Sequence, residues 1–189
     1  LVVYADDFIA GFQYPWEAER FYEQLRSRMA KFGLELEENK SRIVESGRYL
    51  ASLKAKRGES TRLGTFDFLG FTFYCGRTTK GNPWIMPKTS SKKFRQKVKE
   101  IKIWLYNNKE QKLGKLMYML NVKLVGHYRY YGISFNSRMI SNYKQQVREL
   151  LYKVLNRRSE KKSYTREGFI EMMKYYKLVN PKIYYSLFC

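Results

Sequence analysis

The chain opens with two short apolar runs separated by polar residues. Leu1-Val2-Val3 and Phe8-Ile9-Ala10 lie on either side of Tyr4-Ala5-Asp6-Asp7. Two such runs joined by a short polar stretch are typical of a β-hairpin. The pattern therefore predicts a hairpin that carries Asp6 and Asp7 at its turn.

A helical period and further strand patterns follow the hairpin. Residues 15–32 are predicted to form a helix that begins at Pro15 and ends before Gly33, with an apolar stripe made of Ala18, Tyr22, Leu25, Met29 and Phe32. Extended structure is predicted for residues 34–37, 40–44, 66–73 and 84–86, and a basic, weakly ordered connection for residues 47–64. Gly70, within the densest strand pattern, indicates a bulge or a close approach by another backbone.

The second half of the chain has a helical period throughout. Apolar residues recur three and four positions apart in three stretches, which are Phe94 to Leu105, Leu113 to Leu124, and Ile140 to Val154. Short connections between such helices favour a small antiparallel bundle. A shorter helix is predicted at residues 165–177, with Phe169, Ile170 and Met173 facing inward.

The charge of the chain is unevenly distributed. The net charge is +20, but residues 1–50 have a balance of −2 and residues 51–189 a balance of +22. This excess is larger than solubility requires, and it indicates a polyanionic partner. Tyr and Phe residues interleaved with the cations favour nucleic acid over an anionic membrane surface. Neither a membrane span nor a signal peptide is predicted.

Few residues offer other chemistry. Asp6 and Asp7 repel one another unless a cation lies nearby, and Mg²⁺ prefers such carboxylates; ordinary turn chemistry is the alternative. Cys75 and Cys189 lack the spacing of a metal site. We interpret His127, the single histidine, as a structural or RNA-facing group rather than a general base.

The order of these features resembles the reverse transcriptases encoded by bacterial and organellar group II introns. Tyr4-Ala5-Asp6-Asp7-Phe8 is similar to their catalytic YADD hairpin, and Asn39-Lys40-Ser41 to the lysine segment that follows, with Ser41 where threonine is more frequent. Phe66 to Phe71 resembles the primer-grip strand. Three further stretches resemble the aromatic thumb segment and the maturase-type C-terminal region: Gly126 to Tyr131, Asn156 to Thr165, and Asn180 to Tyr184.

The resemblance implies an α+β fold in which part of a polymerase palm, built of antiparallel hairpins and a helix, precedes an all-α thumb and maturase bundle. The implied divisions are 1–87 for the palm, 88–158 for the thumb and 159–189 for the maturase region. Because the chain begins within a predicted strand, we expect the fingers and a further catalytic aspartate to precede Leu1. The complete protein would be an RNA-directed DNA polymerase, cytoplasmic or nucleoid-associated in bacteria, or organellar, and residues 1–189 alone would be inactive.

The resemblance also implies roles for individual residues. Asp6 and Asp7 would hold Mg²⁺ in a two-metal site, and Lys40 would approach the triphosphate of the incoming dNTP. Tyr4 and Ala5 would lie beside the DNA primer end, whose backbone would be held by Leu69, Gly70 and Phe71.

The remaining roles concern RNA. Arg95, Lys99 and Lys102 form a basic stripe that would contact phosphates of the RNA template and its DNA primer. His127, Tyr128 and Arg129 of the thumb segment are further candidates for nucleic-acid contact. Intron RNA would be bound, to assist splicing, by Arg157, Arg158, Lys161 and Lys162. The N-terminal half of the same protein is the other implied partner.

Two other functions fit the sequence less well. A purely RNA-binding splicing factor has no need of the Asp6-Asp7 pair or of Lys40. A retron or phage-defence reverse transcriptase has no need of the maturase-like tail.

Overall fold

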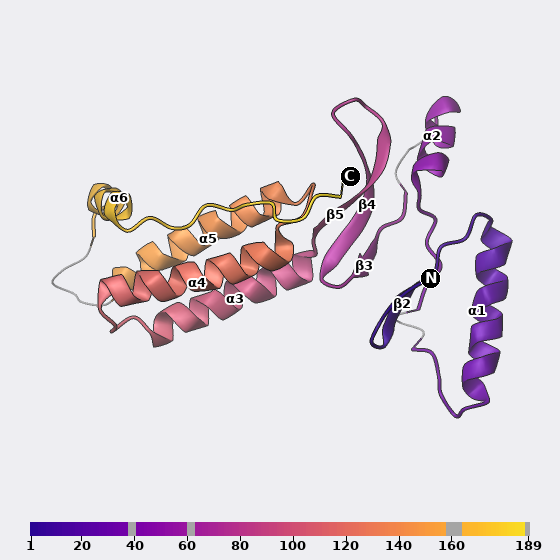
Figure 1. The fold of residues 1–189 in the computed structure, drawn as a ribbon, viewed down its shortest axis with the longest axis horizontal. Coiled ribbons are helices and arrows are strands. Elements are labelled where there is room, and N and C mark those ends of the chain that lie inside the picture. Colours follow the sequence, from indigo (N-terminus) through magenta and orange to yellow (C-terminus); the bar gives the residue numbers. More distant parts are fainter. Residues whose placement is uncertain (38–40, 60–62, 158–163, 188–189) are drawn as a thin grey trace. The chain divides into compact units, whose positions relative to one another are not determined.

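The computed structural model describes residues 1–37, 41–59, 63–157 and 164–187. It divides into two compact units, one made of Leu1–Phe68 and Tyr74–Ile85 and the other of Leu69–Phe73 and Met86–Cys189. Among the described residues, six helices and two small antiparallel sheets form a mixed fold (Figure 1), which confirms the predicted mixture of α and β structure. In this part of the chain no helix is both long and apolar enough to cross a membrane.

The first unit begins with the predicted hairpin. Strands β1 (Val2–Tyr4) and β2 (Asp7–Ile9) pair antiparallel, with Tyr4 opposite Asp7. Ala5 and Asp6 form the two-residue turn, and Ala5 has a φ of 52°, a left-handed conformation that residues with a Cβ rarely adopt. Asp6 therefore lies in the turn, and Asp7 is the first residue of the returning strand.

Helix α1 (Pro15–Ala30) matches its prediction closely. The carboxylate of Glu17 accepts hydrogen bonds from the backbone N–H groups of Gln13 and Tyr14, which satisfies donors at the start of the helix. Gly33, with a φ of 68°, follows its end. None of the residues of α1 is fully buried, so its apolar stripe is only partly covered by the described residues.

Two predictions for the segment after α1 are wrong. Residues 34–37 and 41–44 form no strand, because alternating apolar residues become a strand only beside a partner, and no described strand pairs with them. The connection at 47–64 instead contains helix α2 (Arg48–Lys56), which is rich in residues that favour helices and buries Ala51. The ion pair between Lys54 and Glu45, with 3.5 Å between nitrogen and oxygen, lies beside it.

The three-stranded sheet has the order β3 (Phe66–Phe68), β4 (Phe71–Arg77), β5 (Pro83–Thr89). Residues 66–73, which the sequence predicts as one strand with a bulge, are two strands joined by a tight turn. Leu69 and Gly70 have φ values of 49° and 79°, as the favoured two-residue hairpin turn requires. Gly70 therefore serves the turn, and the predicted bulge is wrong.

The second unit contains the predicted helical bundle. Helices α3 (Ser91–Asn107) and α4 (Leu113–Tyr131) pack with α5 (Ser137–Leu155), in agreement with the three apolar stripes (Figure 1). The side chains with no exposed surface in this core are Leu105, Leu116, Leu120, Leu124, Tyr128, Val147, Leu151 and Val154. Six of these eight residues belong to the predicted apolar stripes, whereas Tyr128 and Leu151 do not.

Helix α6 (Arg166–Tyr175) lies within its predicted range. The hydroxyl of Thr165 accepts a hydrogen bond from the Gly168 N–H at 3.1 Å and so caps the helix. Phe169 is buried as predicted, but Ile170 is 47% exposed, so its predicted inward position is wrong.

After α6, residues 177–187 return along the bundle (Figure 1). The Asn121 amide donates to the Lys177 carbonyl at 3.0 Å and accepts from the Val179 N–H at 2.9 Å. Further along, the N–H groups of Tyr184 and Tyr185 donate to the Gly132 carbonyl. These bonds hold the segment against α4 and the residues that follow it.

Candidate nucleic-acid interface

The predicted basic stripe lies on α3. Arg95, Lys99 and Lys102 are all exposed, whereas Ile101 and Leu105 of the same helix are buried in the core. Their spacing of four and three residues brings the three cations onto neighbouring positions of one helical surface. Like charges at this spacing repel, so the stripe destabilises the helix when no partner is bound. An anionic partner would remove this repulsion.

A single carboxylate interrupts the charge of α3. Glu100 pairs with Lys97 at 2.8 Å, and the hydrogen bond from Lys97 lowers the pKa of the Glu100 carboxyl. Glu100 is thus neutralised within its own helix by a cation that is not one of the three predicted contacts. The stripe keeps its positive charge.

The aromatic segment near the end of α4 is largely structural. Tyr128 is fully buried and its hydroxyl lies 3.5 Å from the Val179 carbonyl, so the prediction that it contacts nucleic acid is wrong. His127 is also buried, with its ring stacked on Tyr143 at 3.7 Å between centroids. Burial, with a contribution from the charge of Lys97, lowers the pKa of His127 to about 4. His127 is therefore neutral and structural, while Arg129 alone of the three predicted contacts is exposed.

The predicted primer-grip residues belong to the second unit, beside the same aromatic segment. The Tyr130 hydroxyl donates to the Leu69 carbonyl at 2.9 Å, and the Ser90 N–H donates to the Gly70 carbonyl at 2.9 Å. A Cβ on Gly70 would lie 3.3 Å from the Tyr131 hydroxyl oxygen. Phe71 is buried, whereas Leu69 and Gly70 are partly exposed, and the predicted role of the three residues in holding a primer stays a prediction.

The candidate metal ligands lie in the first unit. Asp6, Asp7, Tyr4 and Ala5 are all exposed on the β1–β2 hairpin. Among the described residues, no group of three or more His, Cys, Asp or Glu side chains could hold a metal ion. Two adjacent carboxylates suit Mg²⁺ chemically, but by themselves the described residues do not complete the predicted two-metal site.

The comparison with known families concerns the helices of the second unit. Residues 91–176 match the family model described as the group II intron, maturase-specific domain. These residues are therefore similar to a group II intron maturase domain. The match confirms the resemblance to group II intron-encoded proteins for these residues. No curated protein and no solved structure matches the chain.

Residues 91–176, called the maturase domain below because they match that model, contain 21 Lys and Arg residues against six Asp and Glu residues. It includes α3 to α6 and crosses the predicted boundary at residue 158. The separation of a thumb from a maturase region therefore stays a prediction.

Several predicted contacts lie outside the described residues, namely Lys40, Arg158, Lys161 and Lys162. Arg157 is described and exposed, with its guanidinium 5.8 Å from the centre of the Tyr106 ring. The predicted role of the basic run after α5 therefore stays a prediction.

Sequence reasoning missed several exposed residues on α4 of the maturase domain. Tyr118 is 71% exposed, and Lys123 lies over the Trp104 ring, with its nitrogen 5.0 Å from the ring centre. Gly126 belongs to the motif that suggested the family but received no role. On a helical wheel of α4, Tyr118 and Gly126 lie away from the buried residues Leu116, Leu120 and Leu124, so the sequence pattern could have identified them. Lys123 lies close to Leu116 on the wheel and could not have been found in this way.

Proposed function

We propose that this chain binds group II intron RNA through its maturase domain and thereby assists splicing of the intron. The observation that carries the proposal is the exposed stripe of Arg95, Lys99 and Lys102 on a well-packed helix of that domain. Phosphate contacts by such a stripe position RNA without reading its sequence.

The charge of the domain supports RNA as the partner. A large excess of cations is maintained on a surface where neighbouring cations repel one another. Release of counterions from RNA phosphates gives such a surface a strongly salt-dependent affinity for RNA.

The test compares three versions of the whole chain. One version replaces Arg95, Lys99 and Lys102 by glutamine, and a matched control replaces the exposed cations Arg20, Arg28 and Lys31 of the first unit. Affinity for a structured group II intron RNA is measured by filter binding between about 50 and 200 mM salt. Circular dichroism checks that each version is folded.

The unchanged chain is expected to show a steep salt dependence. Loss of the α3 stripe should reduce the slope by about three, one for each phosphate contact, whereas the control should leave it nearly unchanged. A flat salt dependence of the unchanged chain, or equal effects of the two triple variants, would contradict the proposal.

We further propose that the β1–β2 hairpin is part of a reverse-transcriptase site. This second function is favoured by Asp6 and Asp7, exposed side by side at a hairpin turn where Ala5 has a strained conformation. Mg²⁺ bound there would stabilise the charge that develops during nucleotidyl transfer, with Asp6 as the main ligand and Asp7 as the second.

The proposal requires a further carboxylate from outside residues 1–189. We therefore expect this chain alone to add no dNTP to a DNA primer on an RNA template in the presence of Mg²⁺. Asp6→Ala should leave the RNA affinity of the chain unchanged. Incorporation by the chain alone, or loss of RNA binding in Asp6→Ala, would contradict these roles.

A further inference from the structure

Gly126 lies inside α4, where neither the packing nor the backbone conformation requires a glycine. A Cβ built on it would meet no atom within 4 Å, among the described residues. Glycine inside a helix is less stabilising than alanine, because its backbone loses more conformational freedom on folding. The backbone there is ordinary α-helix, so neither crowding nor an unusual conformation requires glycine.

Gly132, just after α4, is by contrast required by the packing around it. A Cβ on Gly132 would lie 2.3 Å from the Tyr128 carbonyl oxygen and 2.4 Å from the Lys182 carbonyl oxygen. Any side chain at residue 132 would therefore push the returning C-terminal segment away. Gly126 has no such neighbour, although it lies only six residues earlier.

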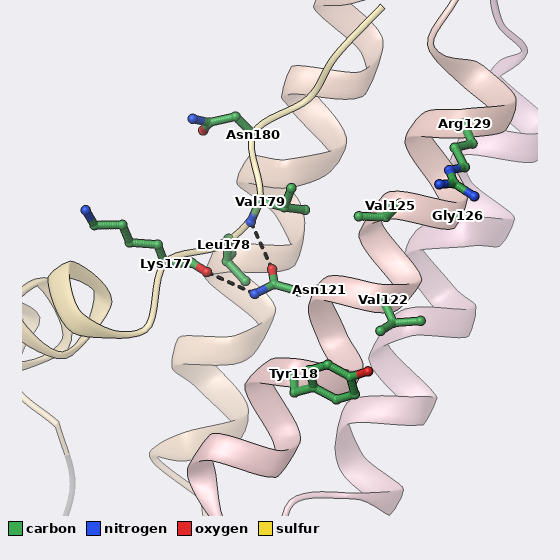
Figure 2. A pocket seen from close by; sticks show the side chains of 10 residues that line it. All are labelled: Tyr118, Asn121, Val122, Val125, Gly126, Arg129, Lys177, Leu178, Val179 and Asn180. Carbon is green, nitrogen blue, oxygen red and sulfur yellow. Dashed lines mark hydrogen bonds between the residues drawn. The ribbon is translucent and has the colours of Figure 1, made fainter. Parts of the chain in front are cut away.

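Two hollows meet at Gly126. The first, of about 720 Å³, is lined by residues 177–180 and by residues of α4 that include Val122, Val125 and Arg129 (Figure 2). The second, of about 460 Å³, lies on the side of α3 and is lined by Lys123 and Tyr130 of α4. Gly126 lines both, so its missing side chain removes the ridge that would otherwise separate them.

The lining combines positive charge with exposed aromatic rings. Cations reach the hollows from three elements, as Lys97, Lys123, Arg129 and Lys177. Of the described residues that line them, Glu100 is the one carboxylate, and Lys97 neutralises it at 2.8 Å. Tyr118 is 71% exposed in the first hollow and Tyr130 is 55% exposed in the second.

We propose that a single-stranded segment of intron RNA crosses α4 at Gly126, with its sugar–phosphate backbone against the glycine. Bases stack on Tyr118 on one side and on Tyr130 on the other, and Lys123 and Arg129 contact the flanking phosphates. Aromatic faces beside cations are the usual means of holding single-stranded RNA, and close approach of a backbone explains the glycine. The inference rests on the proposed RNA-binding function and assigns that function a specific site.

The test separates helix stability from RNA affinity. Gly126→Ala and Gly126→Leu are made in the whole chain, and Gly114→Ala is the matched control. Gly114 lies in the same helix, and a Cβ there would make only an ordinary contact of 3.8 Å with Tyr176. Thermal unfolding and affinity for a single-stranded segment of intron RNA are measured for each.

Gly126→Ala should unfold at a higher temperature than the unchanged chain, because alanine favours the helix. It should nevertheless bind RNA about threefold to tenfold more weakly, and Gly126→Leu more weakly still, because each side chain lifts the strand off the helix and its stacking platforms. Gly114→Ala should bind as the unchanged chain does. If both Gly126 variants bound RNA as tightly as the unchanged chain, only this inference would be overturned. If the unchanged chain bound no RNA, the proposed function would be overturned as well.

A second measurement needs no variant. Intron RNA containing 4-thiouridine is cross-linked to the unchanged chain, and the modified peptides are identified by mass spectrometry. Cross-links at Tyr118 or Tyr130 support the inference. Cross-links confined to residues outside α4 would overturn it.

Discussion

The two units of this chain bury their apolar residues to very different extents. In the second unit, residues such as Leu120 and Leu124 have no exposed surface. In the first unit, α1 buries none of its residues, and Val2 and Val3 of the hairpin are 59% and 61% exposed. A continuous core therefore stabilises the maturase helices, while the described residues do not supply one for α1 and the hairpin.

This difference separates two kinds of candidate site. The basic stripe of α3 stands on a rigid scaffold, so its cations keep their spacing without a partner. Asp6 and Asp7 stand on an exposed two-stranded hairpin, which is at best marginally stable by itself. Large exposed apolar surface usually marks a place of contact with another element or chain.

Truncation of one leucine in each unit gives the largest expected difference between them. Leu124→Ala should lower the free energy of unfolding by about 4 kcal/mol, because it leaves a cavity in a fully buried site. Leu25→Ala, on the apolar stripe of α1, should cost less than about 1 kcal/mol because that side chain is only partly covered. Urea unfolding is followed by fluorescence.

Trp104 reports on the second unit in a background where Trp16 and Trp84 are replaced by phenylalanine. Trp16 of α1 reports on the first unit in a background where Trp84 and Trp104 are replaced. A similar loss from both leucine substitutions would show that α1 is covered as well as α4. The contrast between the units would then be wrong.

A smaller effect is expected from acid, which should lower the free energy of unfolding of the second unit by way of the His127 imidazole. The pKa of this imidazole is about 4 in the folded chain, against about 6.5 when it is unfolded. As pH falls below 6.5 the unfolded chain takes up a proton that the folded chain does not accept until about pH 4. The His127 contribution to the free energy of unfolding should therefore fall by about 3 kcal/mol between pH 7 and pH 4.

His127→Phe isolates this effect. Phenylalanine can keep the stacking on Tyr143 but cannot titrate. The unfolding free energy of the variant, measured by urea at a series of pH values, should decline less steeply below pH 6.5 than that of the unchanged chain. Parallel pH profiles would mean that His127 is accessible and titrates normally.

The sequence predicted the bundle well because its helices bury one stripe each. Leu116, Leu120 and Leu124 recur at helical spacing and all reach the core. The hairpin at Asp6 and the end of α1 at Gly33 were also predicted, since turn residues there follow local preferences. Local periodicity was sufficient in these places.

Prediction failed where distant residues decide the conformation. Leu69 adopts a positive φ that leucine rarely takes, and hydrogen bonds from Tyr130 and Ser90 hold that turn. The burial of Tyr128 likewise depends on the segment that Asn121 holds against α4. Neither contact can be inferred from residues that lie close in sequence.

RNA is expected to contact helices α3 and α4 rather than the exposed first unit. Hydrogen–deuterium exchange of the whole chain, with and without structured group II intron RNA, tests it most directly. RNA should slow exchange in peptides from α3 and α4 and leave exchange in those from α1 unchanged. Equal protection of α1, or no protection of α3 and α4 when RNA is bound, would contradict it.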